Sequence, residues 1–450
     1  MKPDHHNMKF ISNQMLEMED KFNLLEWEIE GIYIWQSARA QIFEKIIRSL
    51  NIEKSKNESK INRVSINLFS SIKRAIINGF ILNPYFDFKK TNNLIFESGR
   101  KELVEEEYID VYTKYLCDHF DKLKKKYTVY SVGLPLRKVK ESFLFNKSLD
   151  FVNFIAKVLS LFYRLNISSE DSLIIDIVAD EFKSRININL DLKSIFKIEF
   201  KRFRSQYISY KLLFNIKQPS NIFLIGSSYK APLIRAAKDC NILVNELQHG
   251  LIVEDGIISN FPNSKENSVN YFPDRFYIWK DLNMCSAKLP LSIENIFFFP
   301  NMHLEKMKNK YNTNVHKSNL ITVISQPLIG KQIFKYIISN IQKMQDWHFI
   351  YKLHPEENLK DYQLSDYEIS ELSNFDFIIN EIPIYKLLSE SKFVIGVFSS
   401  ALFEAKYFGC KIILLDIPGV EFAELLVNQK NVIKIKLAED LNEKISLLSD

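Results

Sequence analysis

The sequence predicts an α/β protein with two doubly wound, parallel-sheet domains that face a central cleft, preceded by extra N-terminal helices. Apolar strand-like runs alternate with helix-like segments in two separate sets, one from residue 221 and one from residue 320. Such alternation is typical of parallel sheets with helices on both faces. A length of 450 residues suits two domains, and 46% apolar with 26% charged residues describes a water-soluble globular protein.

The first half of the chain begins with helices. Apolar residues recur at helical spacing from residue 15 to about 50, interrupted at 30–35, and a polar linker at 54–60 precedes mixed helical patterns up to about 127. Strands are predicted at 127–132, 172–178, 221–225, 242–246, 276–279 and 296–299, with a helix at about 231–240. We therefore expect an α/β core at about 127–300 within an N-terminal, acceptor-side domain of residues 1–315.

The second half repeats the alternation after a polar segment. Residues 303–319 are typical of an interdomain linker. Strands are then predicted at 320–325, 348–353, 375–380, 393–398 and 411–415, and helices at 331–344, 384–389 and 401–408. These elements predict a C-terminal α/β domain of residues 316–450.

Composition excludes several classes of protein. The formal charge of +5 is small for this length and gives no reason to expect nucleic acid as a partner. Cys117, Cys240, Cys285 and Cys410 lack paired spacing, which argues against a zinc site or a disulfide framework and favours a reducing compartment. The N-terminus has no apolar signal core, and the longest apolar stretch, 151–165, is interrupted by polar residues. We expect a cytoplasmic protein, with peripheral contact to the inner face of the plasma membrane left open.

Two basic segments are interleaved with Phe and Tyr. They contain Lys122, Lys124, Lys125, Lys126, Arg137, Lys138 and Lys140 in the first, and Lys197, Lys201, Arg202, Arg204 and Lys211 in the second. Solvated helix faces, a groove for an acidic acceptor and a patch for an anionic membrane surface are all compatible with this pattern.

Candidate catalytic residues follow the strand predicted at 242–246. Gln248-His249-Gly250 is followed by Glu254-Asp255-Gly256, and the strand ends of open α/β sheets are where ligands collect. Adjacent carboxylates repel one another, which raises the basicity of one of them, and a His at a strand end accepts protons near neutral pH. Glu254, Asp255 and His249 are therefore rival general bases, while a plain turn and a structural His are the alternatives.

A second motif, Lys352-Leu-His354-Pro355, lies at the end of the strand predicted at 348–353. Pro355 fixes the turn that directs His354 out of the sheet, and strand alternation places Lys352 on the same face. His354 could donate a hydrogen bond to a departing phosphate, with Lys352 as a positive partner. The alternative is a strand-ending turn with an incidental His.

A third motif, Ser399-Ser400, directly precedes the helix predicted at 401–408. Their hydroxyls and the free N–H groups of the helix would form an anion site, although capping alone also explains them. Glu404 lies one turn further on the same face and could accept hydrogen bonds from ribose hydroxyls. The chain has no G-x-G-x-x-G or Walker-type loop, and no Asp-x-Asp motif, so no metal ion is implied.

Together, the acidic-acidic-Gly, His-Pro and Ser-Ser motifs resemble the motif set of bacterial sialyltransferases and polysialyltransferases, whose GT-B fold has two Rossmann-like domains. The resemblance implies that Glu254 or Asp255 is the general base. It also implies that His354, Ser399 and Ser400 bind the phosphate of CMP.

The motif around His249 is similar to one in the CDP-glycerol glycerophosphotransferases, where the equivalent His is the proposed base and later His-Pro and Ser-Ser motifs recur. The Trp that usually precedes that His is absent here. The stretch from Glu30 to Trp35, followed by Arg39, also resembles the opening of capsule and surface-polysaccharide transferases. Resemblance is good over residues 221–416 and thin over the first 220.

These patterns predict an inverting, metal-independent glycosyltransferase of surface or capsular polysaccharide that requires no cofactor beyond a nucleotide-sugar donor. A CMP-activated nonulosonic acid is the first donor, and a glycan or lipid-linked glycan is the acceptor. The alternatives are a transferase of polyol phosphate from CDP-glycerol or another nucleotide sugar, with His249 as base, and a non-catalytic assembly or binding protein of the same fold.

Overall fold

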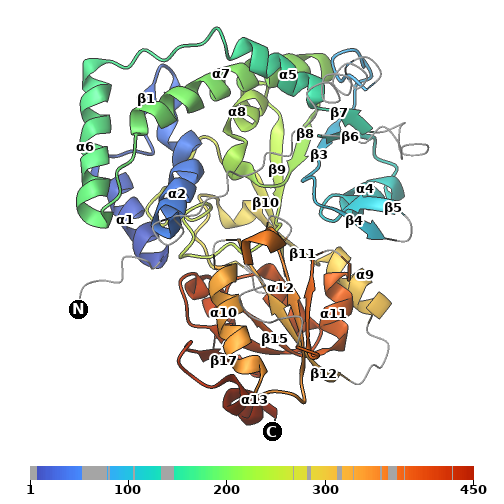
Figure 1. Cartoon of the computed structure of the whole chain (residues 1–450). Coiled ribbons are helices and arrows are strands. Elements are labelled where there is room, and N and C mark those ends of the chain that lie inside the picture. The colour runs from blue at the N-terminus through green and yellow to red at the C-terminus, as the bar shows by residue number, and fades with distance from the viewer. Residues whose placement is uncertain are drawn as a thin grey trace.

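A computed structural model describes residues 8–52, 79, 82–104, 107–132, 146–266, 268–280, 285–311, 317–327, 329–354, 357–362, 372–379, 381–427 and 429–449. The predicted linker at 54–60, the basic residues Arg137, Lys138 and Lys140, and Pro355 lie outside them. The described chain forms two α/β domains, one above the other in Figure 1.

The N-terminal domain contains a sheet with seven described strands in the order β11-β10-β9-β8-β3-β6-β7, and all neighbouring strands are parallel. The strands are β3 (Asn93–Phe96), β6 (Tyr127–Ser131), β7 (Asn146–Ser148), β8 (Asn221–Leu224), β9 (Leu243–Leu247), β10 (Arg275–Trp279) and β11 (Ile296–Phe299). The α/β core therefore starts at β3 and not at about residue 127. The prediction was wrong because the apolar run of β3, Leu94 to Phe96, is only three residues long, too short to mark a strand among the polar residues around it.

Helices cover both faces of this sheet. Helices α5 (Asp150–Leu159), α7 (Leu192–Lys217) and α8 (Ala231–Asp239) pack on one face, and α4 (Lys114–Lys122) packs on the other. Two antiparallel hairpins are added: β1 (Glu28–Ile29) with β2 (Ile32–Tyr33), and β4 (Lys101–Val104) with β5 (Glu107–Asp110).

The extra N-terminal helices are α1 (Met8–Lys21) and α2 (Ile34–Ile52), which share a core with α6 (Ser169–Ile186). Helix α6 occupies the segment 172–178 that was predicted as a strand. That prediction was wrong because Ser168 caps the helix by accepting a hydrogen bond from Asp171 N, and Ile175, Val178, Phe182 and Ile186 are buried at helical spacing. The β-branched run reflects packing within this helical core and not strand pairing.

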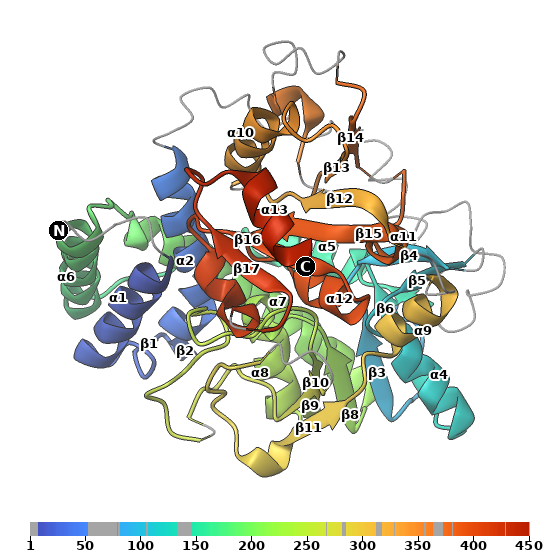
Figure 2. The same cartoon turned by 90° about the horizontal axis from the view of Figure 1, so that it is seen from below.

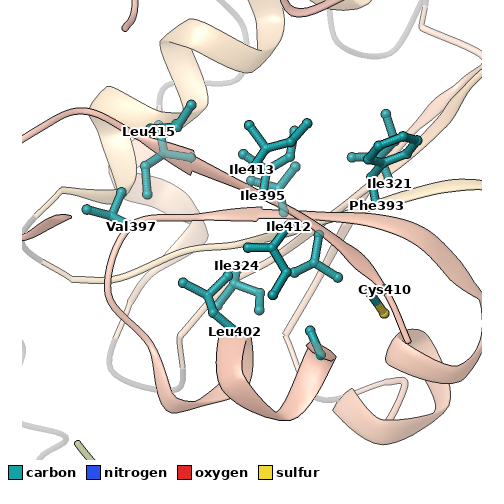
Figure 3. Packing of buried hydrophobic residues seen from close by; sticks show 14 of the residues in the cluster. Ile321, Ile324, Phe393, Ile395, Val397, Leu402, Cys410, Ile412, Ile413 and Leu415 are labelled. Atoms are coloured by element: carbon teal, nitrogen blue, oxygen red, sulfur yellow. The ribbon is translucent and has the colours of Figure 1, made fainter. Parts of the chain in front are cut away.

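The C-terminal domain has a sheet with six described strands in the order β14-β13-β12-β15-β16-β17, all parallel. The strands are β12 (Ser318–Ile324), β13 (His348–Lys352), β14 (Phe375–Ile378), β15 (Ser391–Gly396), β16 (Lys411–Leu415) and β17 (Val432–Ile435). Its helices are α10 (Gly330–Ile341), α11 (Ile384–Glu390), α12 (Ser400–Tyr407) and α13 (Leu441–Ser449). Figure 3 shows Ile321, Ile395 and Ile413 of the neighbouring central strands on one face of the sheet. Ile324 and Ile412 lie on the other face, beside Leu402 of α12.

Residues 302–311 form helix α9 (Met302–Tyr311), where a polar linker was predicted from 303 to 319. Leu304 and Met307, spaced by three, are buried in the C-terminal core, and His303 is 4% exposed. The prediction was wrong because the four Lys and Glu residues of the outer face mask this apolar side.

The carboxyl ends of the strands in the two sheets face each other. Leu251 and Trp279 of the first domain pack against the C-terminal core, and Phe398 of the second packs against the core of the N-terminal helices. The hairpin β4–β5 adds Val104 and Ile109 to the C-terminal core. Figure 2, viewed from below, shows this hairpin beside α9 and α11. These features confirm the predicted fold class, two Rossmann-like domains of the GT-B type with added N-terminal helices.

Within the described residues, no helix is both long enough and apolar enough to cross a membrane.

Candidate active site

Each sheet has one point where the strand order reverses, and the two points lie on the facing edges. In the first domain it lies between β3 and β8, and in the second between β12 and β15. Ligands of open parallel sheets bind outside the carboxyl ends of the strands at such switch points. The residues that follow these strands, 97–100 and 225–230 in one domain and 325–326 and 397–400 in the other, therefore define the candidate site. We call the region between them the interdomain junction.

His249 lies at this junction, two residues after β9. Its imidazole meets the ring of Tyr112 edge-on, with ring centroids 6.1 Å apart, and Tyr112 Oη donates a hydrogen bond of 2.9 Å to the His249 carbonyl. Desolvation by the surrounding protein, with repulsion from Lys230 and Arg100, lowers the pKa of His249 to about 4. The imidazole is therefore neutral at pH 7 and able to accept a proton.

Gln248 fixes the turn that presents His249. Its side chain is fully buried, Oε1 accepts a hydrogen bond of 2.7 Å from Trp279 N, and Nε2 donates one of 2.9 Å to Gly250 O. The turn is thus attached to the next strand of the sheet, so the position of the imidazole is set by the sheet.

Lys230 and Glu246 lie near each other, Lys230 in the segment after β8 and Glu246 close to the end of β9. Lys230 Nζ donates to the Ile225 carbonyl, and burial lowers the pKa of Lys230 to about 8. Glu246 Oε1 accepts a hydrogen bond of 3.0 Å from Ser227 N. Burial raises the pKa of Glu246. A tight turn at Gly226, with φ of 68°, brings these groups together, since this left-handed conformation favours glycine.

Asp255 is directed away from this group and toward helix α1. Its side chain is 9% exposed and pairs with Lys9 Nζ at 3.0 Å, while its carbonyl accepts a hydrogen bond of 2.7 Å from Ser12 Oγ. The backbone of Glu254 is held by Ser286 Oγ and Asn260 Nδ2. The structure thus brings Tyr112, Lys230 and Arg100 to His249, and places the acidic pair in a loop that is attached to α1.

A cluster of charged and aromatic side chains that sequence reasoning missed joins the hairpin β4–β5 to the second domain. Arg100 donates hydrogen bonds to Tyr112 Oη at 2.8 Å and to Glu102 Oε1 at 3.1 Å, and Glu102 Oε2 lies 3.2 Å from His303 Nε2. Glu404, 4% exposed, completes the cluster from α12, and burial raises its pKa against the lowering effect of Arg100. A local signal is Gly99-Arg100, which comes three and four residues after the buried strand β3.

In the second domain, Ser399 and Ser400 open α12 at the switch point. Ser399 Oγ accepts a hydrogen bond of 3.3 Å from Ala401 N and caps the helix, and both serines are half-buried. Gln326, which follows β12, donates through Nε2 to the Phe398 carbonyl and so bridges β12 and β15. Its Oε1 atom is buried without a hydrogen-bond partner in the part of the chain that the structure describes. Because buried acceptors are normally paired, this atom indicates a place for a ligand donor.

His354 follows β13 and is held by its backbone. His354 N donates a hydrogen bond of 2.7 Å to Glu357 Oε2, and Glu357 Oε1 accepts one of 2.9 Å from Ser325 Oγ. Lys352 Nζ donates to the carbonyls of Ile379 at 2.8 Å and Ile382 at 3.1 Å, so it fixes the loop after β14. Both side chains are half-buried.

Among the described residues, no three His, Cys, Asp or Glu side chains gather closely enough to hold a metal ion.

Comparison with known proteins gives no sequence match. No protein-family model and no curated protein matches the chain. Among solved structures, similarity is found to UDP-GlcNAc 2-epimerase from Neisseria meningitidis bound to UDP-GlcNAc, with 14% identity, 79% of this chain and 90% of that chain covered, and a TM-score of 0.46. MurG from Acinetobacter baumannii has 10% identity, with 80% of this chain and 90% of that chain covered, and a TM-score of 0.42. The glycosyltransferase SnogD from Streptomyces nogalater has 10% identity, with 80% of this chain and 91% of that chain covered, and a TM-score of 0.44. At these scores the fold assignment rests on the chain's own sheet orders and on the way its domains face each other.

Proposed function

We propose that the protein is an inverting glycosyltransferase of surface or capsular polysaccharide that uses a nucleotide-sugar donor and needs no metal ion. The observation that carries this proposal is the opposition of two switch points. A neutral His249 lies beside the first, next to Gly226, and the second presents Ser399, Ser400 and the unpaired Gln326 Oε1. One edge can hold an acceptor hydroxyl beside a base while the other holds a nucleotide.

In this mechanism His249 takes the proton of the acceptor hydroxyl as the acceptor oxygen attacks the anomeric carbon. The bond from that carbon to the phosphate oxygen breaks, and the nucleotide leaves with the bonding electrons. The N–H groups at the start of α12, the Ser399 and Ser400 hydroxyls and His354 receive the developing negative charge. Gln326 Oε1 is an acceptor for an amino or hydroxyl group of the nucleoside.

The motif resemblance favours a CMP-activated nonulosonic acid as donor and a glycan or lipid-linked glycan as acceptor. The same motif set makes Asp255 or Glu254 the base, and these residues remain rivals of His249. The pairing of Asp255 with Lys9 and the position of His249 at the junction support His249.

This position of His249 also supports a second candidate function, the transfer of polyol phosphate from CDP-glycerol or a similar donor. In the glycerophosphotransferases that the sequence resembles, the equivalent His is the proposed base. The same side chains would then stabilise departing CMP while the acceptor hydroxyl attacks phosphorus.

Calorimetric titration of CMP, CDP and UDP, followed by transfer assays with CMP-sialic acid and CDP-glycerol, tests these proposals. We expect CMP binding that is lost in His354→Ala and in the double change of Ser399 and Ser400 to Ala. Transfer only from CDP-glycerol would replace the first candidate with the second. Absence of nucleotide binding in the folded wild-type protein would refute both and favour a non-catalytic binding protein.

A further inference from the structure

We propose that the outer face of helices α5 and α7 docks onto an anionic phospholipid bilayer. We call this surface the docking face and define it by the exposed side chains of residues 154–164 and 197–212. It lies at the end of the N-terminal domain opposite the C-terminal domain, at the top of Figure 1 and behind the other elements in Figure 2. The inference does not depend on the reaction proposed above.

Helix α5 and the turn after it expose large apolar side chains on one side. Phe154 is 53% exposed, Val158 40%, and Leu161 and Phe162 76% each. Their spacing of three or four residues places Phe154, Val158 and Leu161 on one helical stripe, while Val152 and Ala156 face the core. The outer side of α5 is therefore apolar although it faces water, which is typical of an interaction surface.

A basic stripe runs along the neighbouring helix. Lys197, Lys201, Arg204, Ile208 and Leu212 follow one another at intervals of three or four, so they share one side of α7. Ile208 is 40% exposed and Leu212 is 47% exposed. The stripe therefore changes from basic to apolar along its length.

The two stripes form one surface. Helices α5 and α7 pack on the same core, and the lining of a groove of about 440 Å³ between them includes Phe162 and Arg164 on one side and Arg204 and Ile208 on the other. Glu30, in the turn between β1 and β2, also lines this groove. Lys157, Arg164, Lys197 and Lys201 are exposed, and none of them forms a salt bridge with another described residue. Arg202, by contrast, is paired with Glu199 at 2.5 Å and belongs to the interior side of the helix.

The combination of side chains favours a bilayer over an acidic glycan. An acidic glycan would satisfy the cations but would leave Leu161 and Phe162 in water. An interface of anionic head groups and acyl chains accepts both, because apolar side chains enter the acyl boundary while Lys and Arg remain at the phosphates. Each cation near such a surface strengthens binding about fivefold.

Co-sedimentation with vesicles tests the proposal. The probes are vesicles of phosphatidylcholine alone and of phosphatidylcholine with an equal part of phosphatidylglycerol, at low and at physiological salt. We expect binding only to the mixed vesicles, weakened by salt because surface charges are screened. Changing Lys197 and Lys201 to Gln should lower the partition coefficient about 30-fold. Leu161→Glu should lower it by at least about tenfold.

Leu447→Glu is the matched control, because Leu447 is 68% exposed on α13 in the other domain. This variant should bind vesicles like the wild type, and CMP titration should be unchanged in all variants, so a failure of docking is separable from a failure of nucleotide binding. Absence of binding to the mixed vesicles, or binding that survives both docking-face variants, would overturn the proposal. Binding to an acidic polysaccharide such as heparin that is sensitive to Leu161→Glu would also overturn it and assign the face to a glycan.

Discussion

Replacing Gly330 with Ala should destabilise the second domain, although alanine is the better helix former. Gly330 is the first residue of α10, directly beyond the switch point. A Cβ there would lie 2.1 Å from Glu357 Oε1, 2.2 Å from Tyr362 Oη and 2.4 Å from Ser325 Oγ, where ordinary contacts begin at about 3.4 Å. All three oxygens would have to retreat by about 1 Å.

These oxygens cannot retreat without breaking hydrogen bonds. Ser325 Oγ donates to Glu357 Oε1 at 2.9 Å, Tyr362 Oη also donates to Glu357, and Tyr351 Oη donates to the Gly330 carbonyl at 2.7 Å. Overpacking costs about 2 kcal/mol, and disruption of one or two buried hydrogen bonds adds about 3 kcal/mol. The gain in helix propensity offsets about 1 kcal/mol. The free energy of unfolding should therefore fall by about 4 kcal/mol.

Chemical denaturation followed by fluorescence measures this loss, and CMP titration should weaken in parallel because Glu357 also holds His354 N. Gly250→Ala is the control, since no atom lies within 4 Å of its added Cβ and its φ is not positive. It should change stability by less than about 1 kcal/mol. A Gly330→Ala protein as stable as the wild type, or more stable, would show that the crowded polar network around Gly330 does not exist.

Three further predictions concern the first domain. Because the pKa of His249 is lowered to about 4, the imidazole is neutral above that pH, so kcat/KM should fall only as the pH drops through about 4. Lys230→Met should move this inflection to higher pH by removing a repelling cation, and an unmoved inflection in the pH profile would contradict the assignment. Asp255→Asn should keep most of the transferase activity and lower the free energy of unfolding by about 1 kcal/mol or less, because Lys9 is half-exposed; loss of activity by several orders of magnitude would instead make Asp255 the base. Arg39→Lys should lower the free energy of unfolding by about 3 kcal/mol, because Arg39 donates hydrogen bonds to both Glu19 carboxylate oxygens, at 2.6 Å and 2.9 Å, and to the Asn260 carbonyl at 2.9 Å. Arg48→Lys is the control in the same denaturation experiment. Because Arg48 belongs to an exposed ion pair, this change should alter the free energy of unfolding by less than about 0.5 kcal/mol.

The elements that sequence patterns predicted well are those marked by a distinct apolar run or by helical spacing of apolar residues. Strands β8, β9, β12 and β13 and helix α10 lie where apolar runs and helical spacing placed them. Strand β3 was missed because its apolar run, Leu94 to Phe96, is only three residues long and stands among polar residues, and α9 was missed because its polar side dominates its composition. These errors share a cause, since burial of a short element depends on its neighbours and not on its own pattern.

The candidate site divides in the same way. Positions directly after a strand, such as His249, His354 and Ser399, can be read from local sequence, because the carboxyl edge of a parallel sheet is where its ligands bind. Arg100 and Tyr112 could not be identified in this way, and Gln326, although it directly follows the strand predicted at 320–325, has a neutral amide that does not mark it as a site residue. Their importance depends on a hairpin that reaches the other domain and on a bond between β12 and β15, which are distant in sequence.

The choice between His249 and Asp255 as base shows why distant contacts decide chemistry. Both residues follow β9 in a Gly-containing loop, and local sequence gives them equal access to the junction. Contacts with helix α1 distinguish the role of Asp255 from that of His249. Glu421 of the second domain accepts hydrogen bonds from Met8 N at 2.7 Å and Lys9 N at 3.3 Å, and Lys9 then pairs with Asp255. Glu421 therefore attaches the start of α1 to the second domain, and the Asp255 carboxylate attaches the same turn of α1 to the loop after β9. Using Asp255 as a base would require breaking its ion pair with Lys9 in each cycle. His249 needs no such rearrangement, because its imidazole is already neutral and its turn is fixed by Gln248.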